Sequence, residues 1–189
     1  MGSGIAHVAA LAGFDVVVSD VSPDRLKSSL ATISGNIARQ VASGKIQETD
    51  KAAALARIVT SADPEALGDA DLVIEAATEK EQVKREVYGA LRAVLKPEAI
   101  LATNTSSISI TRLAAASDRP ERFIGIHFMN PVPVMELVEV IRGIATDRET
   151  FEAAKAFIAR LGKQITVSED YPAFIVNRIL LPMINEAIY

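Results

Sequence analysis

The sequence contains no cysteine and only two histidines in 189 residues. Without cysteine there is no disulfide framework, no thiolate nucleophile and no thiolate metal ligand. The two histidines form no His-x-x-x-His or Glu-x-x-His pattern, so the sequence predicts no metal site. These absences remove cysteine chemistry from the candidate functions and disfavour a metal site.

A strongly basic segment and a long apolar run are absent as well. The net charge is −4 and the isoelectric point is about 5.3, which makes nucleic acid and anionic membranes poor candidates as partners. No apolar run approaches the roughly 18 residues of a transmembrane helix, and no signal-peptide pattern opens the chain. We therefore expect a cytoplasmic protein.

The apolar content is high, at 49% hydrophobic residues, and is rich in the aliphatic types that fill buried parallel strands. We expect strands near 14–20, 58–61, 71–76, 99–103, 123–128, 134–141 and 164–167, and helices near 1–13, 22–44, 49–56, 79–94, 146–162 and 172–189. This order predicts an α/β fold with a helical hairpin over 22–56. The nearly all-apolar segment 71–76 is expected to be a central strand.

The candidate site lies between residues 123 and 141. His127 falls at the end of an apolar strand, and Glu139 falls on the next strand, on the same face as Leu137 and Ile141. A carboxylate in that position is costly to bury unpaired, and His127 is the nearest partner along the chain. The pattern therefore predicts a His–Glu pair, in which the carboxylate orients a general base. The alternative is a structural histidine and an exposed edge-strand glutamate.

The first twenty residues resemble part of a nucleotide-binding unit. A helix of small residues that includes Gly2 and Gly4 precedes a strand that ends at Asp20. In a dinucleotide-binding βαβ unit an acid in that position binds the ribose hydroxyls and favours NAD over NADP. The alternative is that the glycines serve packing and that Asp20 belongs to the cap of the helix that begins at Ser22.

Polar residues also follow other strands. Glu79 and Lys84 lie near the start of the helix after 71–76, and Asn104-Thr105-Ser106-Ser107 follows the strand at 99–103. Parallel sheets bind ligands at this edge, although a first-turn acid and an exposed lysine are common without function. The last segment, 172–189, is apolar nearly all round, with Asn177 inside it, so it needs cover that the first domain does not supply.

Several motifs together resemble the L-3-hydroxyacyl-CoA dehydrogenase family. They are Gly2-Ser3-Gly4-Ile5-Ala6, Ile74-Glu75-Ala76, Asn104-Thr105-Ser106-Ser107, His127-Phe128-Met129-Asn130-Pro131-Val132-Pro133-Val134-Met135 and Phe174-Ile175-Val176-Asn177-Arg178. The resemblance covers the chain end to end. It implies a Rossmann-like doubly wound sheet that lacks its first strand, an NAD-binding domain over 1–170, and the start of an all-α C-terminal domain over 171–189.

By this resemblance His127 is the catalytic base, Glu139 orients it, and Ser106 and Asn177 hold the substrate oxygen. The cofactor contacts implied are Gly2, Asp20, Glu79, Lys84, Ser106 and Asn130. The implied reaction is hydride transfer between the 3-hydroxyl carbon of an L-3-hydroxyacyl-CoA and NAD, within fatty acid metabolism. A homodimer formed through the C-terminal domain is implied as well.

The sequence departs from the family pattern in three ways. The opening strand with two glycines is expected to lie outside this chain, as is the rest of the helical domain, and Ala173 stands where the family usually has glycine. One alternative is therefore a non-catalytic fragment with unpaired inner strand edges, which would neither bind NAD tightly nor turn over acetoacetyl-CoA. Another is a related hydroxyacid or sugar-acid dehydrogenase, although such relatives generally use a lysine base in a different motif.

Overall fold

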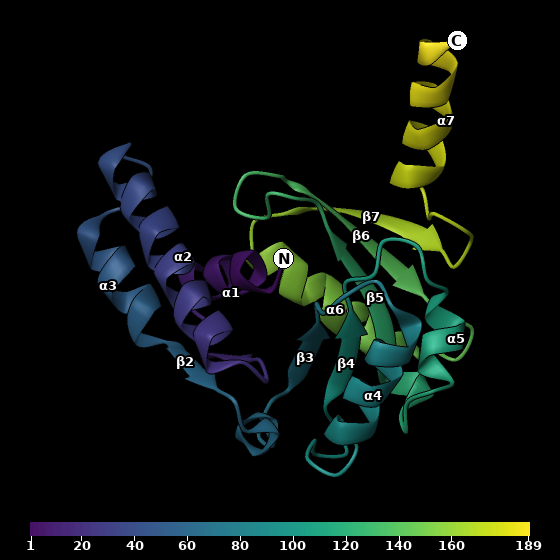
Figure 1. Cartoon of the computed structure of the whole chain (residues 1–189), viewed down its shortest axis with the longest axis horizontal. Helices are drawn as coiled ribbons and strands as arrows, with labels where there is room; N and C mark the ends of the chain where they lie inside the picture. The colour runs from purple at the N-terminus through teal and green to yellow at the C-terminus, as the bar shows by residue number, and fades with distance from the viewer.

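The computed structural model describes residues 1–189, in which helices cover both faces of a mostly parallel sheet (Figure 1). The strands are β1 (Val16–Ser19), β2 (Ile58–Ser61), β3 (Leu72–Glu75), β4 (Ile100–Thr103), β5 (Phe123–Phe128), β6 (Leu137–Arg142) and β7 (Gln164–Glu169). The α-helices are α1 (Gly2–Leu11), α2 (Pro23–Ala42), α3 (Glu48–Ala56), α4 (Glu81–Leu91), α5 (Ile110–Ala114), α6 (Arg148–Arg160) and α7 (Val176–Ile188). Two short 3-10 helices, η1 (Pro64–Leu67) and η2 (Pro120–Arg122), complete the set.

Side chains at the helix starts explain where the longer helices begin. The Ser22 side chain accepts a hydrogen bond from the Arg25 N–H, and Pro23 occupies the first turn of α2. Asp147 caps α6 in the same way, by accepting from the Thr150 N–H. The predicted helical hairpin is present as α2 and α3, which project from one end of the molecule (Figure 1).

The strands form two separate sheets. β1 pairs with β2 in parallel, and the other five strands run in the order β3-β4-β5-β6-β7. The neighbours β3, β4 and β5 are parallel, β5 and β6 are antiparallel, and β6 and β7 are parallel. β3 is therefore an edge strand of its sheet, and the prediction of a central strand at 71–76 is wrong in this respect. Its apolar side chains are only half-buried because no strand pairs with its outer edge.

Two apolar clusters lie on opposite faces of the five-stranded sheet. One joins α1 and α6 to the sheet through residues such as Ile5, Ile126 and Ile158. The other joins α4 and α5 to it, and includes Tyr88 and Phe123. A smaller third cluster holds α1 against α2 and α3. Helices on both faces of the sheet are the arrangement that the sequence predicted.

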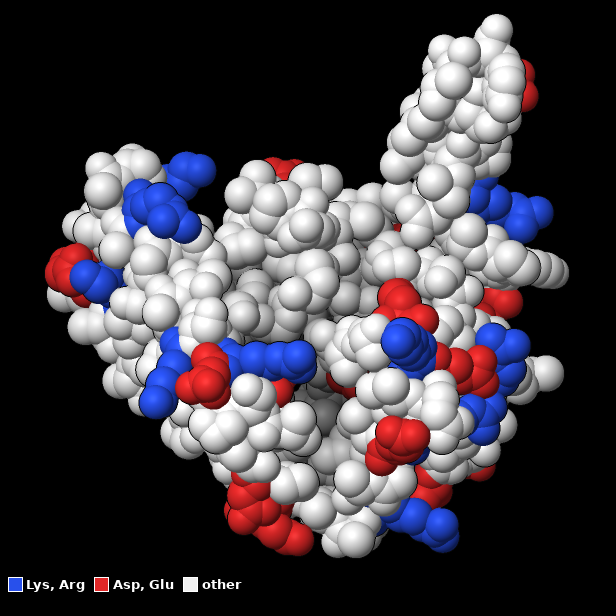
Figure 2. Space-filling model, viewed as in Figure 1, with Lys and Arg blue, Asp and Glu red and all other residues white.

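Helix α7 projects away from the sheets (Figure 1) and has no buried residue. Its surface is almost free of charge in Figure 2, and its exposed apolar residues are Ile179, Leu180, Leu181, Met183, Ile184 and Ile188. No helix in the structure combines the length and the apolarity that crossing a bilayer requires.

Candidate active site

His127 and Glu139 form a buried pair on the adjacent strands β5 and β6. The antiparallel register places the two residues directly opposite each other, so their side chains emerge on the same face of the sheet. His127 Nδ1 lies 2.7 Å from Glu139 Oε2, and the Glu139 side chain is fully buried. The pair that the sequence predicted is therefore present, and the alternative of an exposed edge-strand glutamate is wrong.

The Glu139 carboxylate is held in its ionised form by three hydrogen-bond donors. Burial alone raises the pKa of Glu139, but hydrogen bonds from His127 and from the backbone N–H groups of Val176 and Ile175 outweigh it, so that the pKa lies below its ordinary value of 4.5. An ionised carboxylate only accepts hydrogen bonds, so His127 Nδ1 must carry a proton. The neutral ring then has an unprotonated Nε2, which can act as a base.

Phe174 and Asn177 complete the surroundings of this pair. The Phe174 ring is buried and lies edge-on to the His127 ring, with the ring centroids 5.9 Å apart. Asn177, in the first turn of α7, donates from Nδ2 to the Ser106 carbonyl oxygen at 3.2 Å. The structure thus brings together four residues that the sequence proposed for catalysis: His127, Glu139, Ser106 and Asn177.

A second buried polar cluster surrounds Glu75 at the end of β3. Its carboxylate accepts from Lys84 Nζ at 2.8 and 2.9 Å, from the Tyr88 hydroxyl at 3.0 Å and from the Thr103 hydroxyl at 2.8 Å. The Lys84 side chain is only 1% exposed. The interpretation of Lys84 as an ordinary exposed lysine is therefore wrong, because its ammonium group binds the buried Glu75 carboxylate.

Sequence reasoning missed Glu75 and Thr103 because their neighbours mark each segment as an apolar strand, and missed Tyr88 because it lies on a charged helix away from the strand ends. One signal was available: Glu75 is the only charged residue between Leu72 and Ala76. A lone carboxylate in such a strand needs a partner when it is buried.

Glu79 connects this cluster to the loop after β4. Its carboxylate accepts from the Thr105 hydroxyl at 2.8 Å and from the Ser106 backbone N–H. Lys84 Nζ lies 4.0 Å from the same carboxylate. Because β3, β4 and β5 are parallel, their carboxyl ends share one edge of the sheet, and Glu79, Ser106 and Asn130 follow at that edge. This is where open α/β sheets bind ligands.

Comparison with known proteins gives the same assignment along the chain. Residues 1–171 match the family model described as 3-hydroxyacyl-CoA dehydrogenase, NAD binding domain. The chain belongs to this family. A 3-hydroxybutyryl-CoA dehydrogenase of Bradyrhizobium diazoefficiens is 72% identical over 189 residues, which are 100% of this chain and 64% of that protein. A probable 3-hydroxybutyryl-CoA dehydrogenase of Bacillus subtilis is 48% identical, over 100% of this chain and 66% of its own length.

Solved structures of the 3-hydroxyacyl-CoA dehydrogenases have the same fold. The crystal structure of (S)-3-hydroxybutyryl-CoA dehydrogenase from Ralstonia eutropha aligns with a TM-score of 0.97 at 46% identity, over 99% of this chain and 66% of that one. The 3-hydroxybutyryl-CoA dehydrogenase from Escherichia coli aligns with a TM-score of 0.96 at 43% identity, over 99% of this chain and 40% of that one. The chain spans about two thirds of the length of the curated relatives named above.

NAD is the cofactor of this domain family, and the residues present fit its sugar groups. Glu79 is exposed, and its carboxylate has acceptor capacity beyond the bonds to Thr105 and Ser106. Asp20 Oδ1 accepts from the Ser22 N–H at 2.9 Å, whereas Oδ2 is 3.9 Å from Arg25. Asp20 therefore helps to start α2, as the alternative interpretation held, and keeps one oxygen for a ribose hydroxyl.

Close packing brings the start of α1 beside the loop that contains Asn130. A Cβ atom on Gly4 would lie 3.0 Å from the Val132 Cβ, so α1 approaches this loop closely only because residue 4 is glycine. Gly2 is less confined, since the nearest atom to its Cβ position, on Ala76, is 3.9 Å away. Lys163 fixes the loop from the other side by donating to the Val132 and Met135 carbonyl oxygens at 2.6 and 2.7 Å.

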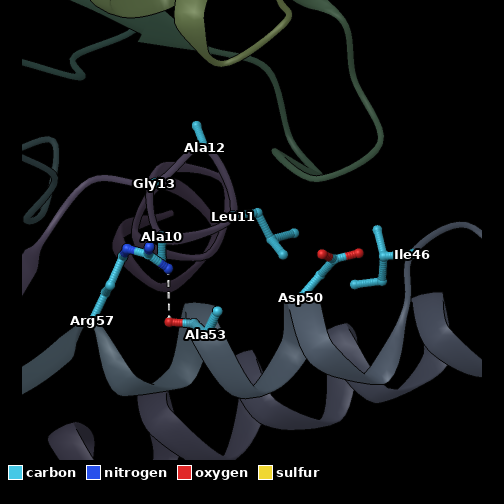
Figure 3. Close-up of a pocket in the computed structure, with 8 residues that line it drawn as sticks. All are labelled: Ala10, Leu11, Ala12, Gly13, Ile46, Asp50, Ala53 and Arg57. Carbon is cyan, nitrogen blue, oxygen red and sulfur yellow. Dashed lines mark hydrogen bonds between the residues drawn. The ribbon is translucent and has the colours of Figure 1, made fainter.

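One cavity, of about 400 Å³, lies between the end of α1 and α3 (Figure 3). It is lined by Ala10, Leu11, Ala12, Gly13, Ile46, Asp50, Ala53 and Arg57. Its two charged residues are already engaged, since Asp50 accepts from the Gln47 N–H and Arg57 donates to the Ala53 carbonyl. The cavity contains none of the site residues predicted from the sequence.

Proposed function

We propose that this site serves NAD-dependent oxidation of an L-3-hydroxyacyl-CoA to the 3-ketoacyl-CoA, with His127 as the base. The observation that carries the proposal is the buried 2.7 Å contact between His127 Nδ1 and Glu139, which leaves Nε2 to take a proton. The family match and the 72% identity to a 3-hydroxybutyryl-CoA dehydrogenase support the substrate class.

Each residue has one task in this proposal. His127 Nε2 accepts the proton of the 3-hydroxyl, and Glu139 keeps the ring in the correct tautomer and stabilises the imidazolium that forms. Ser106 and Asn177 hold the substrate oxygen. NAD, when bound, supplies the acceptor for the hydride that leaves C3. Asp20, Glu79, Ser106 and Asn130 would hold the cofactor, with Gly2 at the start of α1. Lys84 acts through Glu79, because it is buried behind that carboxylate.

The partner, location and domain boundary belong to the same proposal. An acyl-CoA is the substrate, the protein acts in the cytoplasm without nucleic acid or membrane partners, and it forms a homodimer through a helical domain. Residues 1–170 make the NAD-binding domain and 171–189 begin the helical one. The family match over 1–171 supports this boundary, as does the absence of buried residues in α7.

Turnover of acetoacetyl-CoA tests the proposal in the reverse direction. We expect the purified chain to oxidise NADH, followed by the loss of its absorbance, and His127→Asn to lower that rate by about 10²–10⁴-fold. NADH affinity, measured by fluorescence titration, should be unchanged in the variant. Equal rates in the two proteins would contradict the role of His127.

A second candidate, a non-catalytic chain, is favoured by one observation. β1-β2 and the five-stranded sheet are not joined by strand pairing, so Asp20 and Glu79 are carried by separate sheets. If this separation governs function, the chain neither binds NADH tightly nor turns over acetoacetyl-CoA. The same titration distinguishes the two candidates, because only the first predicts saturable NADH binding.

A further inference from the structure

The two oxygens of the Glu139 carboxylate bind different parts of the chain. Oε2 receives the bond from His127, whereas Oε1 accepts from the backbone N–H groups of Ile175 at 3.0 Å and Val176 at 2.9 Å. These N–H groups lie at the start of α7, more than thirty residues further along the chain. One carboxylate on β6 is therefore bonded both to the imidazole and to the backbone that leads into α7.

We call residues 173–177 the junction segment, and its backbone is held in an unfavourable conformation. Ala173 and Phe174 have φ angles of 67° and 53°, in the left-handed region that residues with a Cβ atom seldom adopt. Such residues persist only where the surrounding contacts over-determine them. The Phe174 N–H donates to the Tyr171 carbonyl and the Ala173 carbonyl accepts from the Arg178 N–H. The other contacts available here are the Glu139 carboxylate and the pocket that encloses Phe174.

The helix that follows contributes little to holding the junction segment. α7 has no buried residue, and its apolar side chains are exposed. The fastening points are the two N–H bonds to Glu139, the buried Phe174 ring against His127 and the bond from Asn177 to the Ser106 carbonyl. Of these, only Glu139 contributes an ionised acceptor, and hydrogen bonds to charged acceptors are the stronger kind.

We propose that Glu139 is a positioning residue for Asn177 as well as for His127, because its second oxygen anchors the junction segment. The proposal rests on the proposed function only for its effect on turnover. Its structural part, the anchoring, is independent of any reaction. Glu139 thereby positions both groups that are assigned to the substrate hydroxyl. These are the His127 imidazole, which is the base, and the Asn177 amide, which holds the oxygen. The pKa of Glu139 is lowered, because the bonds from His127 and the two N–H donors outweigh burial, and this agrees with an anchor that is ionised at neutral pH.

Glutamine at position 139 separates the two roles. Its amide oxygen can accept from the N–H groups of Ile175 and Val176, and the opposite orientation would set its NH₂ against both of these donors. The NH₂ group must then face His127 Nδ1, which has to be the unprotonated nitrogen. The proton of the neutral ring is thereby moved to Nε2, so the ring no longer accepts a proton there. Glu139→Gln should therefore keep the anchor and lose the base, whereas Glu139→Ala loses both.

Hydrogen exchange followed by mass spectrometry tests the anchor on the whole chain. We expect the peptide that contains residues 175 and 176 to exchange about tenfold faster or more in Glu139→Ala. Glu139→Gln should retain most of the protection. His127→Asn is the comparison variant: it leaves Oε1 with its two donors and removes only the ring that Phe174 contacts, so it should lose less protection than Glu139→Ala. Protection that is unchanged in Glu139→Ala, or lost equally in His127→Asn, would overturn the proposal.

Glu139→Asp covers the case in which Glu139→Ala unfolds the sheet and loses protection everywhere. The aspartate keeps the negative charge but places it one methylene group further from the junction segment. The loss of exchange protection should therefore be confined to that segment. Uniform exchange across all peptides in Glu139→Asp would contradict an anchor. Turnover is a separate readout: Glu139→Gln should lower kcat on the order of 10³-fold with a preserved KM, and Glu139→Ala should also raise KM. An inactive parent chain would refute the proposed function and leave the exchange result to decide the anchor.

Discussion

Glu75 and Glu139 are the two buried carboxylates of the molecule, and their surroundings differ in one respect. The donors to the Glu75 carboxylate only hold it in place. They are the Lys84 ammonium, the Tyr88 and Thr103 hydroxyls and the Ala77 backbone N–H. None of these groups has, as an imidazole does, a second nitrogen that can take a proton; the Lys84 ammonium instead lies 4.0 Å from the Glu79 carboxylate.

Glu139 instead binds an imidazole that has a second nitrogen. His127 has no protein partner at Nε2, and the ring is held by Glu139 on one side and by Phe174 on another. The comparison teaches that burial and ionic pairing do not by themselves mark a catalytic carboxylate. A catalytic carboxylate is marked instead by a partner that can still exchange a proton. We therefore assign catalysis to the Glu139 region and a structural role to the Glu75 region.

The largest effect that would sharpen this contrast is expected from Lys84→Met. This variant leaves the Glu75 carboxylate buried without its cation, which costs about 3–5 kcal/mol of unfolding free energy. Urea denaturation measures that loss. The double variant Lys84→Met with Glu75→Gln should recover part of it, because a neutral amide is less costly to bury than an unpaired charge. A loss below about 1 kcal/mol would mean that Glu75 is hydrated, and the contrast with Glu139 would fail.

Tyr88→Phe should have a smaller effect on the same cluster. It removes one hydrogen bond to a charged acceptor, which is worth about 1.5–3 kcal/mol. Burial, followed by the charge of Glu75, raises the pKa of Tyr88 well above its ordinary value of 10.0. Above pH 10 the unfolded chain loses this proton while the folded chain keeps it, so the hydroxyl's contribution to stability falls as pH rises.

Denaturation of the wild type and Tyr88→Phe at neutral pH and above pH 10 checks this expectation. The difference in unfolding free energy between the two proteins should shrink at the higher pH. An absorbance titration offers a second check, since the wild type should show a late tyrosinate step that the variant lacks. A difference that grows with pH would show that Tyr88 does not donate to Glu75.

The His–Glu pair could be predicted from sequence because strand alternation is a local signal. Glu139 lies two residues from Leu137 and two from Ile141 on an apolar strand, so burial and the need for a partner followed. The Glu75 cluster could not be predicted in this way. Its donors at positions 84, 88 and 103 are brought to it by a helix and a neighbouring strand, and nothing near Glu75 in the sequence indicates them.

The fold shows the same limit. The positions of helices and strands followed the apolar periodicity closely, including the α2–α3 hairpin. The place of β3 at the edge of its sheet depends on which strands pair, and the exposure expected for Lys84 was wrong because a distant carboxylate binds it. The binding roles of Gly2, Asp20, Glu79 and Asn130 stay predictions, since they concern contacts with a cofactor and not contacts within the chain.

The smallest expected change in unfolding free energy concerns the Glu139 region, and it is a stabilisation. The left-handed conformation at residue 173 costs about 1–2 kcal/mol for alanine, and Ala173→Gly removes this cost. Glycine also raises the conformational entropy of the unfolded chain, which offsets part of the gain. The unfolding free energy should therefore rise by roughly 0.5–1 kcal/mol. Ala173→Val, whose branched side chain resists this conformation more strongly, is the matched control and should destabilise the protein. If glycine also destabilises, the left-handed backbone at 173 carries no strain for the surrounding contacts to offset.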